Sequence, residues 1–348
     1  MTRPEPAPRA TAQVRIDHFS AVHLAADLAR RTAQRCGLRG ALPDQAAAVA
    51  SELASNLDKH ATDGIVYLQP LALGQGLEVL AVDRGPGMSH LQRCLSDGYT
   101  TTNTLGTGLG AVDRVADEFV IRTQVPFGTV ACARLLAPRE PTARSASAQH
   151  TPPPAFGRKS GWVCLPAEGE EECGDGAAVR VTSQGQTAVV VDGLGHGQDA
   201  ARATRVALRA FHTDPESPLP ALMQELHRAL RHTRGAAVGL IRIEPGGMHF
   251  CGVGNVRVVA LHPLLPTRRI ESRPGIVGLN LPTPQTRTAP LEAGQTALVH
   301  SDGIETRWSH NPSSFLARLP APLLPAALAH RHRRLRDDAT ALALTGIH

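Results

Sequence analysis

Two long blocks of patterned apolar and polar residues are separated by a stretch with almost no large apolar side chain. That stretch, residues 138–158, reads PREPTARSASAQHTPPPAFGR. A composition of Pro, Ala, Ser, Thr and Arg is typical of a flexible or partly extended linker. We therefore predict two domains, residues 1–137 and 159–348, each long enough to bury a core of its own.

The pattern of the first block changes between helical and extended periods. Residues 14–38 predict a short strand followed by an amphipathic helix, and Asp44 is expected to cap a second helix that runs to about His60. The remaining pattern predicts strands at 66–73, 77–82, 119–123 and 129–135 and a helix near 109–117. Together these elements predict an α/β sandwich with helices against a mostly antiparallel sheet.

Three polar motifs in this block are suited to bind a nucleotide. Glu52, Asn56 and His60 recur every four residues, so they share one helix face, where a carboxylate can act as a general base and a carboxamide can ligate Mg²⁺. Asp83 opens the turn DRGPG directly after an apolar strand, where it can accept the exocyclic amine of adenine. The stretch GTGLG at 106–110 precedes a helix and offers backbone amides to phosphates. Each motif alone also fits a polar stripe or a tight turn, but the three in this order indicate a nucleotide site.

In this order the motifs resemble the N, G1 and G2 boxes of the gyrase, Hsp90, histidine kinase and MutL (GHKL) superfamily of ATP-binding domains. The likeness is closest to its small serine-kinase branch, the anti-sigma kinases and RsbT-type switch kinases, and extends over most of residues 12–137. The segments LSDGYTTT at 95–102 and VADEF at 115–119 carry it. The resemblance implies Glu52 as the base that activates a protein hydroxyl and Asn56 as the Mg²⁺ ligand. The further ATP-binding residues that it implies are Asp83, Gly85, Gly87, Gly106, Gly108, Gly110 and Thr129.

The second block carries four aspartate motifs, each beside an apolar strand or a glycine. They are CGDG with Asp175, VVVDGLGHG with Asp192, LVHSDG with Asp302, and RDDAT with Asp337 and Asp338. Carboxylates that converge at strand ends repel one another unless a cation holds them, and hard oxygen ligands suit Mg²⁺ or Mn²⁺. Two such ions can bind a phosphate and lower the pKa of a bridging water. The block therefore predicts a divalent metal centre.

These motifs resemble the metal-dependent protein phosphatases of the 2C class, in the SpoIIE branch and closest to the RsbX type, over roughly residues 160–346. The segments RGAAV at 234–238 and VGNVR at 253–257 carry the finer likeness. The resemblance implies a PPM-type β-sandwich flanked by helices and a centre of two Mn²⁺ or Mg²⁺ ions. The implied ligands are Asp175, Asp192, the Gly193 carbonyl, Asp302 and Asp337, with Asp338 adjacent. His196 is either a proton shuttle to the leaving serine or a residue exposed by its turn.

Composition excludes several other classes of protein. The six cysteines form no C-x-x-C pair, which excludes the usual zinc and thioredoxin-like motifs, and we interpret them as reduced thiols that are mostly buried. A net charge of +5 over 348 residues and an aromatic content of 3% argue against a nucleic-acid partner. No run approaches the roughly 18–20 apolar residues that span a membrane, and the first ten residues lack a secretory signal. We expect a cytoplasmic protein.

The α+β chain is thus expected to join a GHKL-type ATP-dependent serine/threonine kinase to an opposing phosphoserine and phosphothreonine phosphatase. The resemblances imply STAS-domain proteins of a stressosome-like or anti-sigma switch as partners. In an alternative reading, the first domain captures a partner in an ATP-dependent way, and the phosphatase is the only enzyme. A third reading is a metal-binding scaffold in which both sites are inactive.

Overall fold

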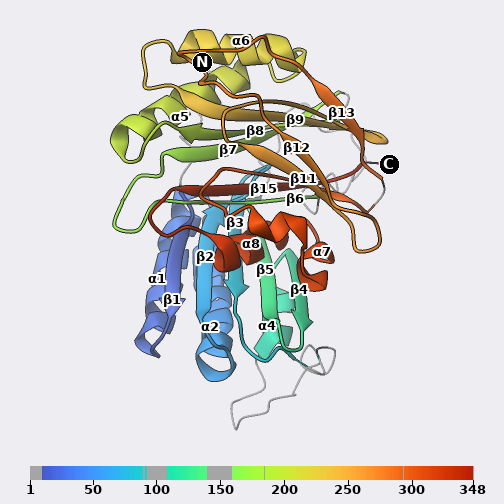
Figure 1. The fold of residues 1–348 in the computed structure, drawn as a ribbon. Helices are drawn as coiled ribbons and strands as arrows, with labels where there is room; N and C mark the ends of the chain where they lie inside the picture. Colours follow the sequence, from blue (N-terminus) through green and yellow to red (C-terminus); the bar gives the residue numbers. More distant parts are fainter. Residues whose placement is uncertain are drawn as a thin grey trace, which may run out of the picture. The chain divides into compact units, whose positions relative to one another are not determined.

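The computed structural model describes residues 10–88, 91, 108–138, 159–183, 185–292 and 294–347 (Figure 1). The described residues divide into two compact units. The first contains residues 12–138, and the second contains residues 159–347 together with residues 10 and 11. Among the described residues, no helix is both long enough and apolar enough to cross a membrane.

The first unit is built on a five-stranded antiparallel sheet with strand order β1-β2-β3-β5-β4. The strands are β1 (Ala12–Ile16), β2 (Gly64–Pro70), β3 (Gly76–Val82), β4 (Glu118–Gln124) and β5 (Gly128–Leu136). Helices α1 (Ser20–Arg35), α2 (Leu42–His60) and α4 (Gly108–Val115) pack on one face of this sheet. The helices α1 and α2 contact each other, and both contribute fully buried alanines such as Ala25, Ala29 and Ala50 to the core of this unit.

The helices and strands expected in the first block are present, but the predicted cap by Asp44 is wrong. Helix α2 begins at Leu42, with Pro43 in its first turn, and no side chain caps its N-terminus. Proline is favoured there because its missing N–H would have no partner in a helix anyway. The Asp44 carboxylate instead accepts a hydrogen bond from Arg30 Nε of α1 at 2.8 Å.

The second unit contains two five-stranded antiparallel sheets that pack face to face (Figure 1). The first sheet has the order β13-β10-β9-β8-β7 and is formed by β7 (Asp175–Thr182), β8 (Gly185–Gly193), β9 (Ala236–Glu244), β10 (Gly247–Val253) and β13 (Arg287–Pro290). The second has the order β12-β11-β14-β15-β6 and is formed by β6 (Ser160–Leu165), β11 (Arg257–Leu261), β12 (Arg268–Glu271), β14 (Thr296–His300) and β15 (Ala339–Thr345).

Helices cover the outer faces of both sheets of this sandwich. Helices α5 (Gln198–Thr213) and α6 (Leu219–Leu230) pack on the first sheet, while α8 (Leu324–His332) packs on β15 and β6 of the second. The short helices η2 (Arg307–His310) and α7 (Ser314–Ala317) precede α8. A β-sandwich flanked by helices is therefore the observed architecture, and the mixture of α and β structure expected from the sequence is present.

The strand β8 shows why the sequence reads as an apolar run that ends in a carboxylate. Val189, Val190 and Val191 are fully buried because one side of the strand faces α5 and the other faces the second sheet. The run stops at Asp192, the penultimate residue of β8, where the strand reaches the edge of the sandwich. The core thus places the first polar residue after the run at a strand end.

Candidate metal centre and nucleotide site

The aspartates of the second unit gather at one end of its strands. Asp175 opens β7 and lies directly opposite Asp192 in the antiparallel pairing of β7 with β8. Side chains of facing residues have Cβ atoms roughly 4.5–5.5 Å apart. In the second sheet, Asp302 follows β14, and Asp337 and Asp338 precede β15, which pairs with β14. Ser301, the residue before Asp302, donates a hydrogen bond to Asp175 Oδ2 at 2.6 Å, so both sheets contribute to one cluster.

Ser301 connects the two sheets at this cluster, a role that the sequence did not indicate. Its hydroxyl donates to Asp175 Oδ2 at 2.6 Å and accepts the Thr340 N–H at 2.9 Å. The Ser301 N–H also donates to the Thr340 carbonyl at 3.0 Å. Because Ser301 is fully buried, these bonds are shielded from water and fix the orientation of the Asp175 carboxylate.

Asp338 holds the backbone in front of β7. Its Oδ1 accepts the Ala167 N–H at 2.8 Å, and its Oδ2 accepts the Gly174 N–H at 2.9 Å. The Gly174 carbonyl in turn accepts the Gly193 N–H at 3.1 Å and the Thr204 hydroxyl. Asp338 therefore positions the residue before Asp175, while direct metal ligation by Asp338 stays a prediction.

Burial and mutual repulsion shift the protonation of these carboxylates. Burial raises the pKa of Asp175 well above its ordinary value, and nearby acidic groups, among them Asp338 and Asp337, raise it further. Burial and the charges of Asp175 and Asp302 raise the pKa of Asp192 to about 10. The pKa of Asp337 is also raised, first by burial and then by the charge of Asp302. A divalent cation would favour the ionised form of all three.

The donor set fits a hard cation. Asp192 Oδ2 is buried and has no hydrogen-bond partner among the described residues, so a cation could satisfy it. No three His, Cys, Asp or Glu side chains in the described part of the chain form a ready metal-ligand group. A bound ion would therefore need backbone carbonyls or waters as well, as Mg²⁺ commonly does. Gly193, whose carbonyl is a predicted ligand, is the last residue of β8. A Cβ atom on Gly193 would lie 2.5 Å from the Ala200 backbone oxygen.

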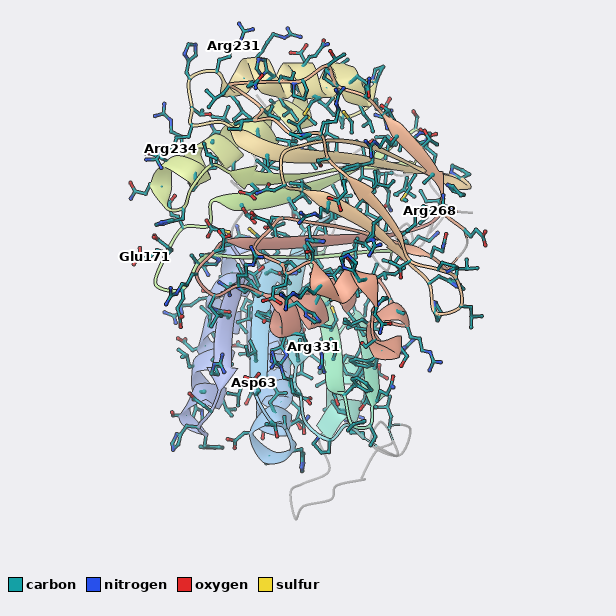
Figure 2. The ribbon with its side chains drawn as sticks, in the orientation of Figure 1. Asp63, Glu171, Arg231, Arg234, Arg268 and Arg331 are labelled. Carbon is teal, nitrogen blue, oxygen red and sulfur yellow. The ribbon has the colours of Figure 1, made fainter. Side chains whose placement is uncertain are left out.

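The exposed side chains around the cluster form ion pairs. His196 is exposed, and its Nδ1 lies 2.8 Å from Glu170 Oε1. The role of His196 in proton transfer stays a prediction. Arg234, labelled in Figure 2, contacts Asp199 in the first turn of α5 at 2.7 Å. Burial raises the pKa values of Asp175, Asp192 and the neighbouring Cys173 thiol in this region.

In the first unit, helix α2 carries the predicted base and magnesium ligand on one stripe. Glu52 and Asn56 are half-buried, one turn apart, and His60 is exposed at the C-terminal end of the helix. Asn56 Nδ2 is buried and has no hydrogen-bond partner among the described residues. A buried donor of this kind requires a partner from a ligand, from water or from elsewhere in the chain.

The predicted adenine site is a compact turn around Asp83. This residue is buried, and its Oδ1 accepts the N–H groups of Gly85 at 2.6 Å and Thr129 at 3.2 Å. A Cβ atom on Gly128 would lie 2.5 Å from the Asp83 carbonyl oxygen, so the strand β5 approaches the turn only because residue 128 is glycine. Gly87 has φ +75°, which glycine adopts without strain. The structure thus brings Asp83, Gly85 and Thr129 together.

The phosphate-binding prediction falls only partly on described residues. Gly108 and Gly110 lie in the first turn of α4, which packs against α2. Gly106 lies outside the described residues. The N-terminus of α4 is therefore on the same side of the sheet as Glu52 and Asn56, and ATP binding by these residues stays a prediction.

The chain is similar to known proteins in both parts of its sequence. Residues 183–345 match the family described as stage II sporulation protein E (SpoIIE). The serine/threonine-protein kinase RsbT of Bacillus subtilis (strain 168) is 32% identical over 107 residues, which are 30% of this chain and 80% of RsbT. The phosphoserine phosphatase RsbX of the same organism is 24% identical over 149 residues, which are 40% of this chain and 71% of RsbX.

A solved structure reported under the heading "The bacterial stressosome: a modular system that has been adapted to control secondary messenger signaling" is also similar. The matched region is 32% identical in sequence and spans 53% of this chain and 97% of the chain in that structure, with a TM-score of 0.49. From the extent and identity of the RsbT match and from the SpoIIE match, the chain belongs to the RsbT family and carries a phosphatase domain of the 2C class, of the SpoIIE type and homologous to RsbX.

Proposed function

We propose that this protein is a bifunctional cytoplasmic regulator of a partner-switching pathway. Its first unit is a GHKL-type ATP-dependent serine/threonine kinase, and its second is a metal-dependent phosphoserine and phosphothreonine phosphatase. Both act on STAS-domain proteins of a stressosome-like or anti-sigma switch. The observation that carries the proposal is the buried pair of Asp175 and Asp192 beside Asp302, since such carboxylates are stable as anions only around cations.

In the phosphatase unit, the oxygens of Asp175, Asp192, Asp302 and Asp337, together with the Gly193 carbonyl, hold Mn²⁺ or Mg²⁺. When bound, the cations supply a Lewis acid for the phosphate and lower the pKa of water. Ser301 keeps the Asp175 carboxylate oriented through its 2.6 Å hydrogen bond. Asp338 keeps the backbone of Gly174 in place, so Asp175 starts β7 in a fixed position.

In the kinase unit, each motif has a separate task. Glu52 accepts the proton of the substrate hydroxyl as it attacks the γ-phosphate of ATP. Asn56 ligates Mg²⁺, and Asp83 with Thr129 binds adenine. The backbone amides of the stretch from 106 to 110 and the N-terminus of α4 bind the phosphates.

One experiment tests both activities on one substrate. A STAS-domain protein is incubated with the chain, Mg²⁺ and ATP labelled at the γ-phosphate, and Mn²⁺ is added after the label has reached a plateau. We expect label to appear on the STAS-domain protein and then to disappear. Glu52→Gln should prevent labelling, whereas Asp192→Asn should allow labelling but prevent its removal. Asp214→Asn, at an exposed position after α5, serves as the control for a lost surface charge.

The outcomes separate the proposal from its alternative. If Glu52→Gln leaves labelling unchanged, Glu52 is not the base and the kinase proposal is wrong. If the parent transfers no label but retains the STAS-domain protein only in the presence of ATP, the first unit is a capture module and the phosphatase is the only enzyme. Loss of label that is equal in the parent and in Asp192→Asn would refute the assigned metal centre.

A further inference from the structure

Two cysteine thiols of the second unit lie in contact next to Asp175. Cys164 is the fifth residue of β6, and Cys173 lies two residues before β7. Their Sγ atoms are 3.4 Å apart, and both cysteines are reduced. Nothing in their spacing indicates a pair, since eight residues separate them and neither belongs to a C-x-x-C motif. Cys164 lies on the edge strand β6 of the second sheet and Cys173 precedes the edge strand β7 of the first, and contact between these two strands brings them together.

The two thiols are joined to the backbone of the metal centre. Cys164 Sγ donates to the Asp175 carbonyl oxygen at 3.3 Å. Cys173 is followed by Gly174, whose N–H is bonded to Asp338 Oδ2 and whose carbonyl accepts the Gly193 N–H. A displacement of either sulfur is therefore transmitted directly to the backbone that carries Asp175.

A small cavity gives access to the pair. It has a volume of about 120 Å³, and its lining includes Cys173, Asp175, Thr204 and Glu171, the last labelled in Figure 2. This volume admits molecules the size of water or hydrogen peroxide. Cys164 is 2% exposed and Cys173, which lines the cavity, is 9% exposed, so we expect a small oxidant to react at Cys173 first.

We propose that Cys164 and Cys173 form a reversible disulfide under hydroperoxide stress and that this bond switches off the adjacent phosphatase site. The Cys173 sulfur attacks one peroxide oxygen, which gives a sulfenic acid and one water. The Cys164 sulfur then displaces the hydroxyl of the sulfenic acid, which forms the disulfide and a second water. Two thiols are oxidised by two electrons in total, and one peroxide is reduced to two waters.

The structure indicates why this bond would inactivate the site. The sulfurs must close from 3.4 Å to about 2.05 Å, which is the length of a disulfide. The oxidised Cys164 can no longer donate to the Asp175 carbonyl, and Gly174 must follow the movement of Cys173. Reduction by a dithiol restores both contacts. This inference rests on the proposed phosphatase activity for its second half only, since the disulfide itself is a property of the fold.

The test uses the full-length chain, loaded with Mg²⁺ so that no redox-active metal is present. The reduced protein is incubated with hydrogen peroxide for hours, because burial raises the pKa of the Cys173 thiol and slows its reaction. Trypsin releases residues 160–180, which contain both cysteines and no third one. The disulfide makes this peptide two hydrogens lighter and blocks its alkylation. Cleavage after Glu168 or Glu172 then yields two fragments that separate only after reduction.

We expect the linked peptide to accumulate in step with at least a tenfold loss of phosphatase activity, and dithiothreitol to reverse both changes. Activities are normalised to each variant before oxidation. Cys164→Ala should lose little activity to peroxide, whereas Cys251→Ala, which removes another buried thiol, should respond like the parent. An absent 164–173 linkage after prolonged exposure would refute the disulfide, and a linkage without loss of activity would refute the switch. A reduced parent without phosphatase activity would refute the proposed function and leave the peptide result to decide on the disulfide.

Discussion

Replacement of Arg134 by methionine should destabilise the first unit through one buried carboxylate. Arg134 lies on β5 and is 4% exposed; its Nη2 is 2.6 Å from Glu78 Oε1 on β3, and its Nη1 is 3.2 Å from Glu118 Oε2 on β4. Glu78 is fully buried, and burial raises its pKa although the charge of Arg134 opposes this shift. Without Arg134, the only side-chain bond left to Glu78 among the described residues is the one from Gln69 Nε2 at 2.7 Å.

Removal of one partner from a buried ion pair costs about 3–5 kcal/mol, because the remaining charge is left without compensation. Amides that exchange through opening of this unit should therefore exchange about 10²-fold to 4 × 10³-fold faster, at 1.4 kcal/mol for each factor of ten. Hydrogen exchange read by mass spectrometry on peptides from β3 and β5 measures this change. Peptides from β8, in the other unit, provide a reference within the same sample.

Two further variants make the reasoning refutable. The double variant Glu78→Gln/Arg134→Met has no buried charge at position 78. It should therefore recover more than half of the protection from hydrogen exchange that Arg134→Met loses. Arg122→Met removes an exposed arginine from the neighbouring strand β4 and should change stability by less than about 0.5 kcal/mol. If Arg134→Met costs less than about 1 kcal/mol, or if the double variant is no more stable than the single one, the burial argument is wrong.

The pH dependence of Arg134→Met has a definite sign. A carboxyl whose pKa is raised by folding destabilises the protein increasingly as the pH rises through its unfolded value, about 4.3 for Glu. The difference in unfolding free energy between variant and parent should therefore shrink as the pH is lowered from 8 to 5. A difference that stays constant over this range would show that Glu78 ionisation is not its cause.

Three more predictions concern the second unit. Gly303→Ala should abolish Mn²⁺-dependent phosphatase activity, because the added Cβ atom would overlap the backbone oxygen of Asp338. Gly247→Ala is the control and should stay active in the same assay, since its Cβ atom would lie 3.7 Å from the nearest neighbouring atom. Asp192→Asn should remove the Mn²⁺-induced rise of the melting temperature. Since Asp192 has a pKa of about 10, the affinity of the parent for Mn²⁺ should rise by up to about tenfold per pH unit between pH 6 and 9 in titration calorimetry. Ser301→Ala should lower kcat more than it raises KM and should cost about 1–3 kcal/mol in chemical denaturation, because it leaves a buried backbone N–H unpaired.

Much of the second unit could be predicted because its signals are local. An apolar run that stops at Asp-Gly marks a buried strand that reaches the surface, and this pattern places both Asp192 and Asp302 at strand ends. In the first unit, the sequence also indicated the turn at Asp83, where a carboxylate follows a buried strand and a glycine stands two residues later. These features depend on residues that are near one another in the chain.

The features that the sequence did not reveal depend on contacts between distant segments. Ser301 reaches Asp175 across 126 positions, and Asp338 reaches Gly174 across 164, so neither role has a local signature. The contact between Cys164 and Cys173 depends on contact between the edge strands β6 and β7 of the two sheets. Asp44 was misread for a related reason, since its partner Arg30 lies on another helix.

The bonds around Gly174 have a consequence for how the metal centre would fill and empty. Its N–H and carbonyl are held by Asp338, Gly193 and Thr204, and Ser301 holds the side chain of the next residue. The hydrogen bonds of the protein alone hold the ligand residues in place. Cation binding therefore does not have to offset the conformational entropy of ordering the chain. Chelation should then leave a folded apoprotein that reloads within the mixing time, in contrast to small zinc domains, which unfold when they lose their ion.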